Sequence, residues 1–129
     1  MEVLASRILV HPGDIARSLH FYRDVLGLGV FREWGTEGDP GHGMVFFLGG
    51  GFLELSGRSP AAPSGTLELW LQVRDVDATH EELAGLGVPI GEPPTDKPWG
   101  LREMRVLDPD GVRLVIVEVP KDHPLRYRP

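Results

Sequence analysis

The segment DIARSLHFYRDVLGL, residues 14–28, follows a short apolar stretch that ends at a His-Pro-Gly break. Its apolar residues recur at helical spacing: Ile15, Leu19, Tyr22 and Leu26. Asp14 stands where a side chain can accept backbone N–H bonds at the start of a helix. We therefore predict a strand over residues 3–10 and an amphipathic helix over residues 15–26, which ends at the following glycines.

Outward from this segment, the chain shows the same order of features twice: a strand, an Asp, a helix, a Leu-Gly pair and three strands. In the first half the later strands are expected over residues 29–34, 44–48 and 52–56, the last two joined by three glycines. In the second half we expect strands over 67–73, 88–90, 101–107 and 112–117, a helix over 77–84, and a Pro-rich loop over 92–100. This internal repeat predicts an α+β fold of two βαβββ units, with mixed sheets and the helices on one face.

The chain length of 129 residues is typical of a single domain. We place the first repeat unit at about residues 3–57 and the second at about 66–118. A segment rich in Pro, Ser, Gly and Ala, residues 58–65, is the predicted linker. The polar tail, residues 119–129, is expected to lie on the surface.

The composition excludes several classes of protein. A formal net charge of -6 argues against a nucleic-acid partner, which would require clustered Lys and Arg. The absence of Cys excludes disulfides and thiolate metal sites. No stretch approaches the roughly 18 apolar residues that span a bilayer. The beginning of the chain does not resemble a signal peptide, so we expect a cytoplasmic protein without a membrane partner.

Four motifs in this order resemble the glyoxalase/bleomycin-resistance/dioxygenase superfamily, also called the vicinal oxygen chelate superfamily. They are residues 14–28, FLEL at 52–55, PWGLRE at 98–103 and DPDG at 108–111. The resemblance implies a cup-shaped sheet with the ligand inside it, and commonly a homodimer. Because this fold hosts lyases, dioxygenases, epimerases, thiol transferases and drug-sequestering proteins, it does not by itself assign a function.

Alternation along the strands predicts which residues face the cup. The uniformly apolar series Leu67, Leu69, Leu71, Val73 is expected to face the helices, as are Leu53, Leu55, Ile8 and Val10. The candidate ligand-binding residues are then Arg7, Leu9, Phe47, Phe52, Glu54, Glu68, Trp70, Gln72, Trp99 and Val115. Aromatic residues in this set favour a flat aromatic ligand held by stacking, and Trp34 is a further candidate for the rim.

The resemblance also implies four metal-ligand positions, which map onto Arg7, Glu54, Glu68 and Val115. Arg is protonated near neutral pH and Val has no donor atom, so only two carboxylates remain. A catalytic transition-metal site usually needs about three protein ligands. We therefore predict no metal and no other cofactor, and hypothesise that Arg7 pairs with Glu54 and Glu68 as a substitute cation.

Two functions remain open from the sequence. The first is a small-molecule binding protein of the bleomycin-resistance type, which sequesters an aromatic natural product or antibiotic without a metal. The alternative is an enzyme of the lyase, isomerase or dioxygenase kind, in which Glu54 or Glu68 acts as a base or a metal ligand. A regulatory or immunity module without a small ligand is a third reading that no sequence feature favours.

Overall fold

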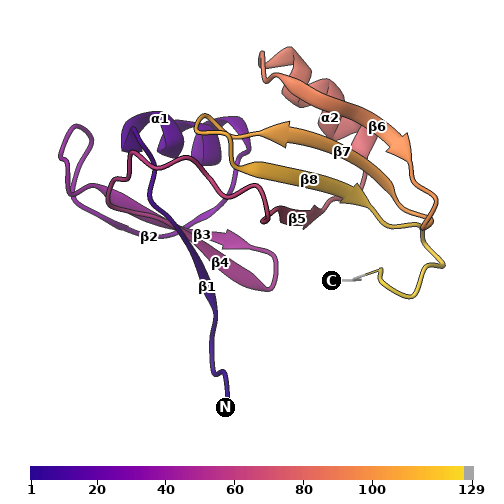
Figure 1. Ribbon diagram of the computed structural model, residues 1–129, viewed down its shortest axis with the longest axis horizontal. Coiled ribbons are helices and arrows are strands. Elements are labelled where there is room, and N and C mark those ends of the chain that lie inside the picture. The colour runs from indigo at the N-terminus through magenta and orange to yellow at the C-terminus, as the bar shows by residue number, and fades with distance from the viewer. Residues whose placement is uncertain (127–129) are drawn as a thin grey trace. The chain divides into compact units, whose positions relative to one another are not determined.

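The computed structural model describes residues 1–126 (Figure 1). The first half contains β1 (Arg7–Val10), α1 (Ile15–His20), a π-helical segment η1 (Phe21–Val25), β2 (Val30–Trp34), β3 (Gly43–Leu48) and β4 (Gly51–Leu55). The second half contains β5 (Leu69–Gln72), α2 (Val76–Gly85), β6 (Ile90–Asp96), β7 (Arg102–Leu107) and β8 (Arg113–Glu118). The predicted α+β class with a duplicated βαβββ unit is confirmed.

The chain forms two compact units, unit 1 over Met1–Pro63 and unit 2 over Ser64–Pro129. Each unit contains one four-stranded sheet, with the order β1-β4-β3-β2 in unit 1 and β5-β8-β7-β6 in unit 2. In both sheets the first and last strands of the unit pair in parallel, and the other neighbours are antiparallel. That the two units together make a single domain with the predicted segment boundaries stays a prediction.

Each helix begins with an Asp side chain that accepts a backbone N–H. Asp14 accepts from Arg17 N at 3.2 Å, and Asp75 accepts from Ala78 N at 2.9 Å. Both Asp residues have extended backbone conformations, as expected for a residue that caps a helix. The two Asp residues that mark the sequence repeat thus have the same structural role in both units.

The core of unit 1 lies between its helix and one face of its sheet. Tyr22 packs against Phe46 of β3, with ring centroids 6.3 Å apart, and against Phe21 at 5.1 Å. The fully buried residues of this core are Leu19, Tyr22, Met44, Phe46, Leu53 and Leu55. The predicted helix over 15–26 continues as a π-helical turn after His20, and this wider turn buries the consecutive residues Phe21 and Tyr22.

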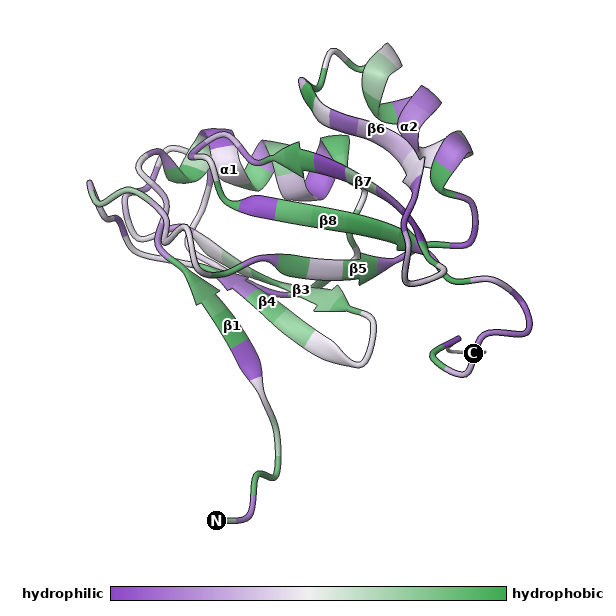
Figure 2. Ribbon diagram, turned by 45° about the vertical axis from the view of Figure 1, so that its right-hand side comes forward, coloured by the Kyte–Doolittle hydropathy of each residue, from purple (hydrophilic) through white to green (hydrophobic). Residues whose placement is uncertain are grey.

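In unit 2, β8 is buried on both faces, and its hydrophobic colour extends along most of the strand in Figure 2. Leu114 and Ile116 alternate with Val115 and Val117 along the strand, and all four are buried. Val115 and Val117 form a cluster with Leu101 and Val119. The beginning of the predicted surface tail is therefore part of the core, whereas residues 127–129 lie outside the described residues.

Two sequence predictions are wrong in detail. The segment expected to be a Pro-rich loop after Ile90 continues as strand β6 through Asp96. A strand can contain Pro93 and Pro94 here because β6 lies at the sheet edge, where shifts in register interrupt its pairing with β7. Leu67 was expected to face the helix, but it precedes β5 and is exposed. Ile8 does share the helix side with Leu53, as expected, and its place in the edge strand β1 leaves it partly exposed.

Two turns follow the sequence prediction. Gly49, with a φ of 58°, begins the two-residue turn between β3 and β4, a conformation that favours glycine. Asp108 begins the turn between β7 and β8, and its Oδ1 accepts the N–H groups of Asp110 and Val112, both at 2.8 Å. Within the described part of the chain, no helix has the length and apolar character needed to cross a membrane.

Candidate functional site

Each sheet has a second face that carries no helix of its own unit, which we call the helix-free face. In unit 1, Leu53 and Leu55 of β4 face the helix, so Phe52 and Glu54 face the opposite way. The strand register places Arg7, Leu9, Val45 and Phe47 on the same helix-free face. Five of the predicted site residues, Arg7, Leu9, Phe47, Phe52 and Glu54, therefore share one face.

Three phenylalanine rings form a cluster on this face. Phe31 is 4.8 Å from Phe52 and 5.2 Å from Phe47 between ring centroids, and Phe47 is 5.8 Å from Phe52. Phe31 and Phe47 each keep about half of their surface exposed: 50% and 48%. The cluster is thus an accessible aromatic surface.

Phe31 was missed in the sequence because a single sequence does not specify which residues of β2 lie on the helix-free face. The pairing of β2 with β3 shifts between Val30 and Arg32, which leaves Phe31 outside the regular register. At this irregularity, the ring of Phe31 lies against the rings of Phe47 and Phe52. A bulge of this kind has no sequence signal as clear as a glycine or a proline.

An ion pair lies beside the phenylalanine cluster. The Arg7 guanidinium donates to Glu54 Oε1 at 2.8 Å, and the Ser56 hydroxyl donates to Glu54 Oε2 at 2.7 Å. These bonds, first that of Ser56 and then that of Arg7, lower the pKa of Glu54 below its ordinary value. His11 Nδ1 lies 2.6 Å from the carbonyl oxygen of Ser56, at the end of the same two strands.

This lowered pKa predicts a pH-dependent contribution of Glu54 to stability. A carboxyl group with a lowered folded-state pKa stabilises the protein above its unfolded pKa, and the contribution is lost as pH falls through the folded pKa. We expect Glu54→Gln to lower the free energy of unfolding at pH 7. This difference from wild type should shrink as the pH falls below 4.5, the ordinary pKa of a Glu side chain. Urea denaturation at a series of pH values measures it.

The matched control for Glu54→Gln is Glu81→Gln, which changes an exposed carboxylate on α2. Its difference from wild type should stay small throughout the series. A Glu54→Gln difference that is the same at pH 7 and pH 3 would contradict the role given to the Ser56 and Arg7 contacts.

Trp34, a further candidate for the rim, packs against its own sheet. It pairs with Gly43, and a Cβ at Gly43 would lie 2.4 Å from the Trp34 ring. The glycine therefore leaves the space that the half-buried indole covers. This contact gives Trp34 a structural role in unit 1.

In unit 2 the helix-free face carries Trp70 and Gln72 of β5. The register aligns Trp70 with Val115 of β8, and Val115 with Arg105 of β7. Trp70 is about half exposed, whereas Val115 is buried and offers little surface. Trp99, at the end of the segment that the sequence predicted to be a loop, lies between β6 and β7 and is exposed.

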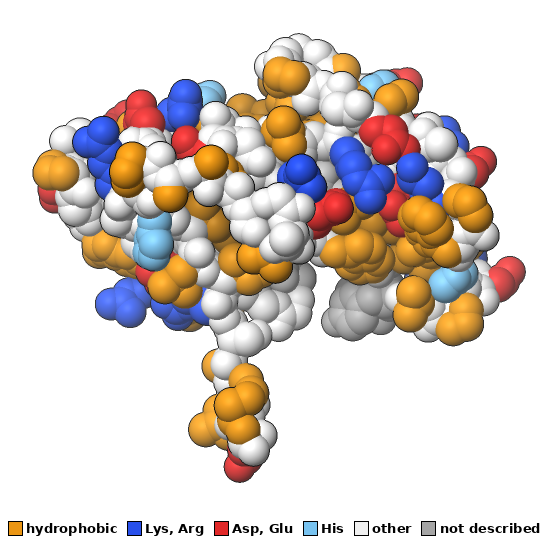
Figure 3. Space-filling model, viewed as in Figure 1, with side chains coloured by type: hydrophobic (Ala, Val, Ile, Leu, Met, Phe, Trp, Pro, Cys, Tyr) orange, Lys and Arg blue, Asp and Glu red, His pale blue; other side chains and the backbone are white. Residues whose placement is uncertain are grey.

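Arg105 lies among three carboxylates on this face and was missed in the sequence. Its Nε is 3.4 Å from Glu68, and its Nη1 is 3.4 Å from Glu92 and 3.7 Å from Glu103. Basic and acidic side chains lie side by side over the strands of this unit in Figure 3. The hypothesis paired Glu68 with Arg7, but the partner of Glu68 within unit 2 is Arg105.

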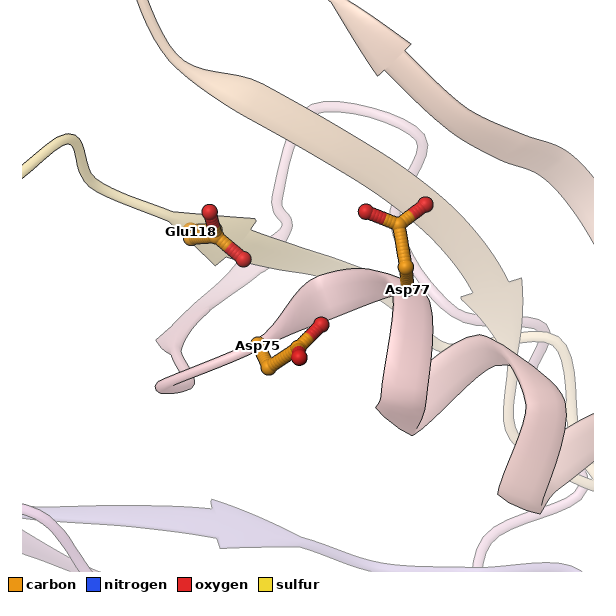
Figure 4. Close-up of side chains that lie close together, drawn as sticks. All are labelled: Asp75, Asp77 and Glu118. Carbon is orange, nitrogen blue, oxygen red and sulfur yellow. The ribbon is translucent and has the colours of Figure 1, made fainter.

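A second acidic group, Asp75, Asp77 and Glu118, lies at the start of α2 (Figure 4). Asp75 caps the helix, and Glu118 Oε1 accepts the N–H of Val76 at 3.0 Å. Asp77 accepts from Arg102 of β7 at 2.9 Å, and this bond lowers the pKa of Asp77. These contacts explain the group as a helix start that is tied to its sheet.

The comparison with known families follows from this architecture. The model of the Glyoxalase/Bleomycin resistance protein/Dioxygenase superfamily matches residues 5–116. The chain belongs to this superfamily. The uncharacterized protein YraH of Bacillus subtilis (strain 168) is 31% identical over 121 residues, which cover 85% of this chain and 92% of YraH.

Solved structures share the fold of this chain. A superfamily member from Sphaerobacter thermophilus DSM 20745 has a TM-score of 0.71 and 25% identity, and the match covers 91% of this chain and 98% of that one. TnmS3, an antibiotic binding protein from Streptomyces sp. CB03234, has a TM-score of 0.74 and 24% identity, with coverage of 92% and 98%.

The side chains at the four positions where the superfamily resemblance implies metal ligands do not suit a transition metal. Arg7 is a cation that already binds Glu54, and Val115 is buried and has no donor atom. Glu54 and Glu68 remain, and each contacts an arginine. Two carboxylates that are each neutralised by a guanidinium form a poor donor set for a dication.

Proposed function

We propose that this superfamily member is a small-molecule binding protein in which the helix-free face of a unit holds a flat aromatic ligand without a metal. The observation that carries this proposal is the phenylalanine cluster, in which Phe31 and Phe47 are half exposed on a strand face. Contiguous exposed apolar patches are uncommon on soluble domains and often mark binding sites.

Stacking supplies the expected affinity. Each aromatic contact contributes about 0.5–1.5 kcal/mol beyond the area that it buries. Phe31 and Phe47 in unit 1 and Trp70 in unit 2 offer such contacts. Arg7 and Glu54, beside the cluster, provide polar groups that would orient a ligand with donors and acceptors.

The charge state of Glu54 weighs against the alternative in which it acts as a general base. A useful base at neutral pH has a pKa near 7, and burial or a neighbouring carboxylate usually produces it. The Ser56 hydroxyl and Arg7 instead lower the pKa of Glu54. Glu54 is therefore a weak base that is better suited to accept hydrogen bonds.

The printed name of one structural neighbour agrees with this proposal, since TnmS3 is described as an antibiotic binding protein. We extend this to a natural product or antibiotic as the ligand class, and to antibiotic resistance as the biological setting. A homodimer and a cytoplasmic location, both expected from the sequence, are part of the same proposal.

Calorimetry tests the metal-free part of the proposal. The apo protein is titrated with nickel, zinc, manganese and, under anaerobic conditions, ferrous iron. We expect no stoichiometric binding tighter than about 1 μM, which corresponds to roughly 8 kcal/mol. Arg7→His, which restores a donor next to Glu54, should gain measurable nickel or zinc affinity. Tight binding by the wild type would overturn this part of the proposal.

Tryptophan quenching tests the ligand class. The panel contains flat aromatic antibiotics and two planar dyes of opposite charge, proflavine and anthraquinone-2-sulfonate. We expect saturable quenching by at least one member, and a smaller quenching amplitude in Trp70→Ala, in which Trp34 and Trp99 remain. A wild type that binds no member of the panel would contradict the proposal.

A further inference from the structure

Glu103 is a buried carboxylate on the helix-free face of β7. Its side chain is 5% exposed, and it is the one buried Glu among the described residues. Burial of a carboxylate is costly unless hydrogen bonds or a cation compensate for the lost water. Asp108, also buried, is explained by the turn N–H groups that it accepts, but Glu103 has no such backbone partner among the described residues.

The partner of Glu103 is an exposed aromatic side chain. Glu103 Oε2 accepts the indole N–H of Trp99 at 2.7 Å, and Oε1 lies 3.7 Å from Arg105 Nη1. Trp99 itself is 57% exposed. A buried charge therefore holds the polar edge of a ring whose surface remains open to solvent.

The turn that carries Trp99 is closed at both ends. Lys97 N donates to Leu101 O at 2.8 Å, and Gly100 N donates to Lys97 O at 2.9 Å. The Lys97 ammonium binds Glu92, and this contact, with Arg105 nearby, lowers the pKa of Glu92. Since the backbone of the turn is held, the remaining freedom of Trp99 lies in its side-chain torsions, and the bond to Glu103 restricts those.

We propose that Glu103 is a positioning residue that fixes the Trp99 indole as a preformed stacking surface for the aromatic ligand. A ring that is already ordered loses less side-chain entropy when a ligand stacks on it, and this preorganisation increases affinity. Because it concerns the ligand of the proposed function, this inference rests on that proposal. It adds Trp99 and Glu103 to the proposed binding site as a pair, in which Glu103 acts through the indole of Trp99.

The first readout needs no ligand. In a Trp34→Phe, Trp70→Phe background, Trp99 is the remaining tryptophan, and its anisotropy decay and acrylamide quenching report its mobility. We expect Glu103→Leu to raise the quenching constant about twofold and to add a fast anisotropy component. Glu103→Gln keeps an oxygen acceptor and should restore the parent behaviour. An unchanged Trp99 mobility in Glu103→Leu would overturn the inference.

The second readout is proflavine affinity, followed by the fluorescence of the dye in proteins with the native Trp34 and Trp70. We expect a loss of about tenfold in Glu103→Leu, and little change in Glu103→Gln. Trp99→Phe replaces the indole with a smaller aromatic ring and removes the N–H at an exposed position, so it should fold and show a similar loss. Full affinity in Trp99→Phe and Glu103→Leu would overturn the ligand role and leave a merely structural bond.

The two readouts separate this inference from the proposed function. If the wild type does not bind proflavine or any other dye of the panel, the proposed function fails, and the ligand role of Glu103 fails with it. If the wild type binds and Glu103→Leu loosens Trp99 without weakening the dye, the inference alone fails. The inference is supported if Glu103→Leu makes Trp99 more mobile and weakens dye binding, and if Glu103→Gln keeps the wild-type mobility and affinity.

Discussion

Leu114→Ala is expected to lower the free energy of unfolding by about 3 kcal/mol, the usual range for a buried Leu being about 2–5 kcal/mol. Leu114 is 0% exposed and lies in β8, between Leu69 of β5 and Val106 of β7. Its removal leaves a cavity in the middle of the sheet of unit 2, which neighbouring strands cannot fill without losing their register. Denaturation in urea, monitored by far-UV circular dichroism, measures the loss.

The matched control is Leu107→Ala on the neighbouring strand β7. Leu107 is 51% exposed, so its truncation removes less buried area and should cost under about 1 kcal/mol. Equal losses in the two variants would show that Leu114 does not occupy the core position described here.

Phe47→Ala is expected to weaken an aromatic ligand by about thirtyfold in Kd, which corresponds to about 2 kcal/mol. The ring contributes to the phenylalanine cluster from β3 and is half exposed. Truncation therefore removes a stacking surface while the core on the opposite face stays intact. The measurement is a titration with the tightest-binding dye or antibiotic of the panel.

Two further variants identify the source of the Phe47 effect. Phe47→Tyr keeps the ring and should retain most of the affinity, whereas Phe47→Leu keeps apolar area without a ring and should lose most of it. Leu86→Ala changes an exposed apolar residue after α2 and should have no effect. A Phe47→Ala variant that binds as tightly as wild type would show that the phenylalanine cluster is not part of the ligand-binding site.

The fold could be predicted from the sequence because its decisive signals are local. Asp14 and Asp75 begin helices, and glycines mark the turns, so the order of elements follows from neighbouring residues. The extent of β6 could not be predicted, because Pro93 and Pro94 usually break a strand, and only their place at a sheet edge makes them compatible with one.

The candidate site could be predicted in part. Alternation along β4 placed Phe52 and Glu54 on one face, and the first strand added Arg7. The role of Arg105 could not be predicted, because Glu68 and Glu92 are far from it in sequence. Glu103 contacts residues that are near in sequence, Trp99 and Arg105, but its burial depends on how β7 pairs in the sheet. Side chains on different strands meet only when the register is known, and a single sequence does not specify the register.

The measurement that tests the central claim most directly is a two-dimensional NMR titration of the ¹⁵N-labelled wild-type protein with the aromatic panel. We predict saturable shifts on a helix-free face, at the amides of Phe31 and Phe47 in unit 1 or at the indole N–H of Trp70 in unit 2. Shifts confined to α1 and α2, or no shift with any member of the panel, would contradict the claim that a helix-free face binds an aromatic small molecule.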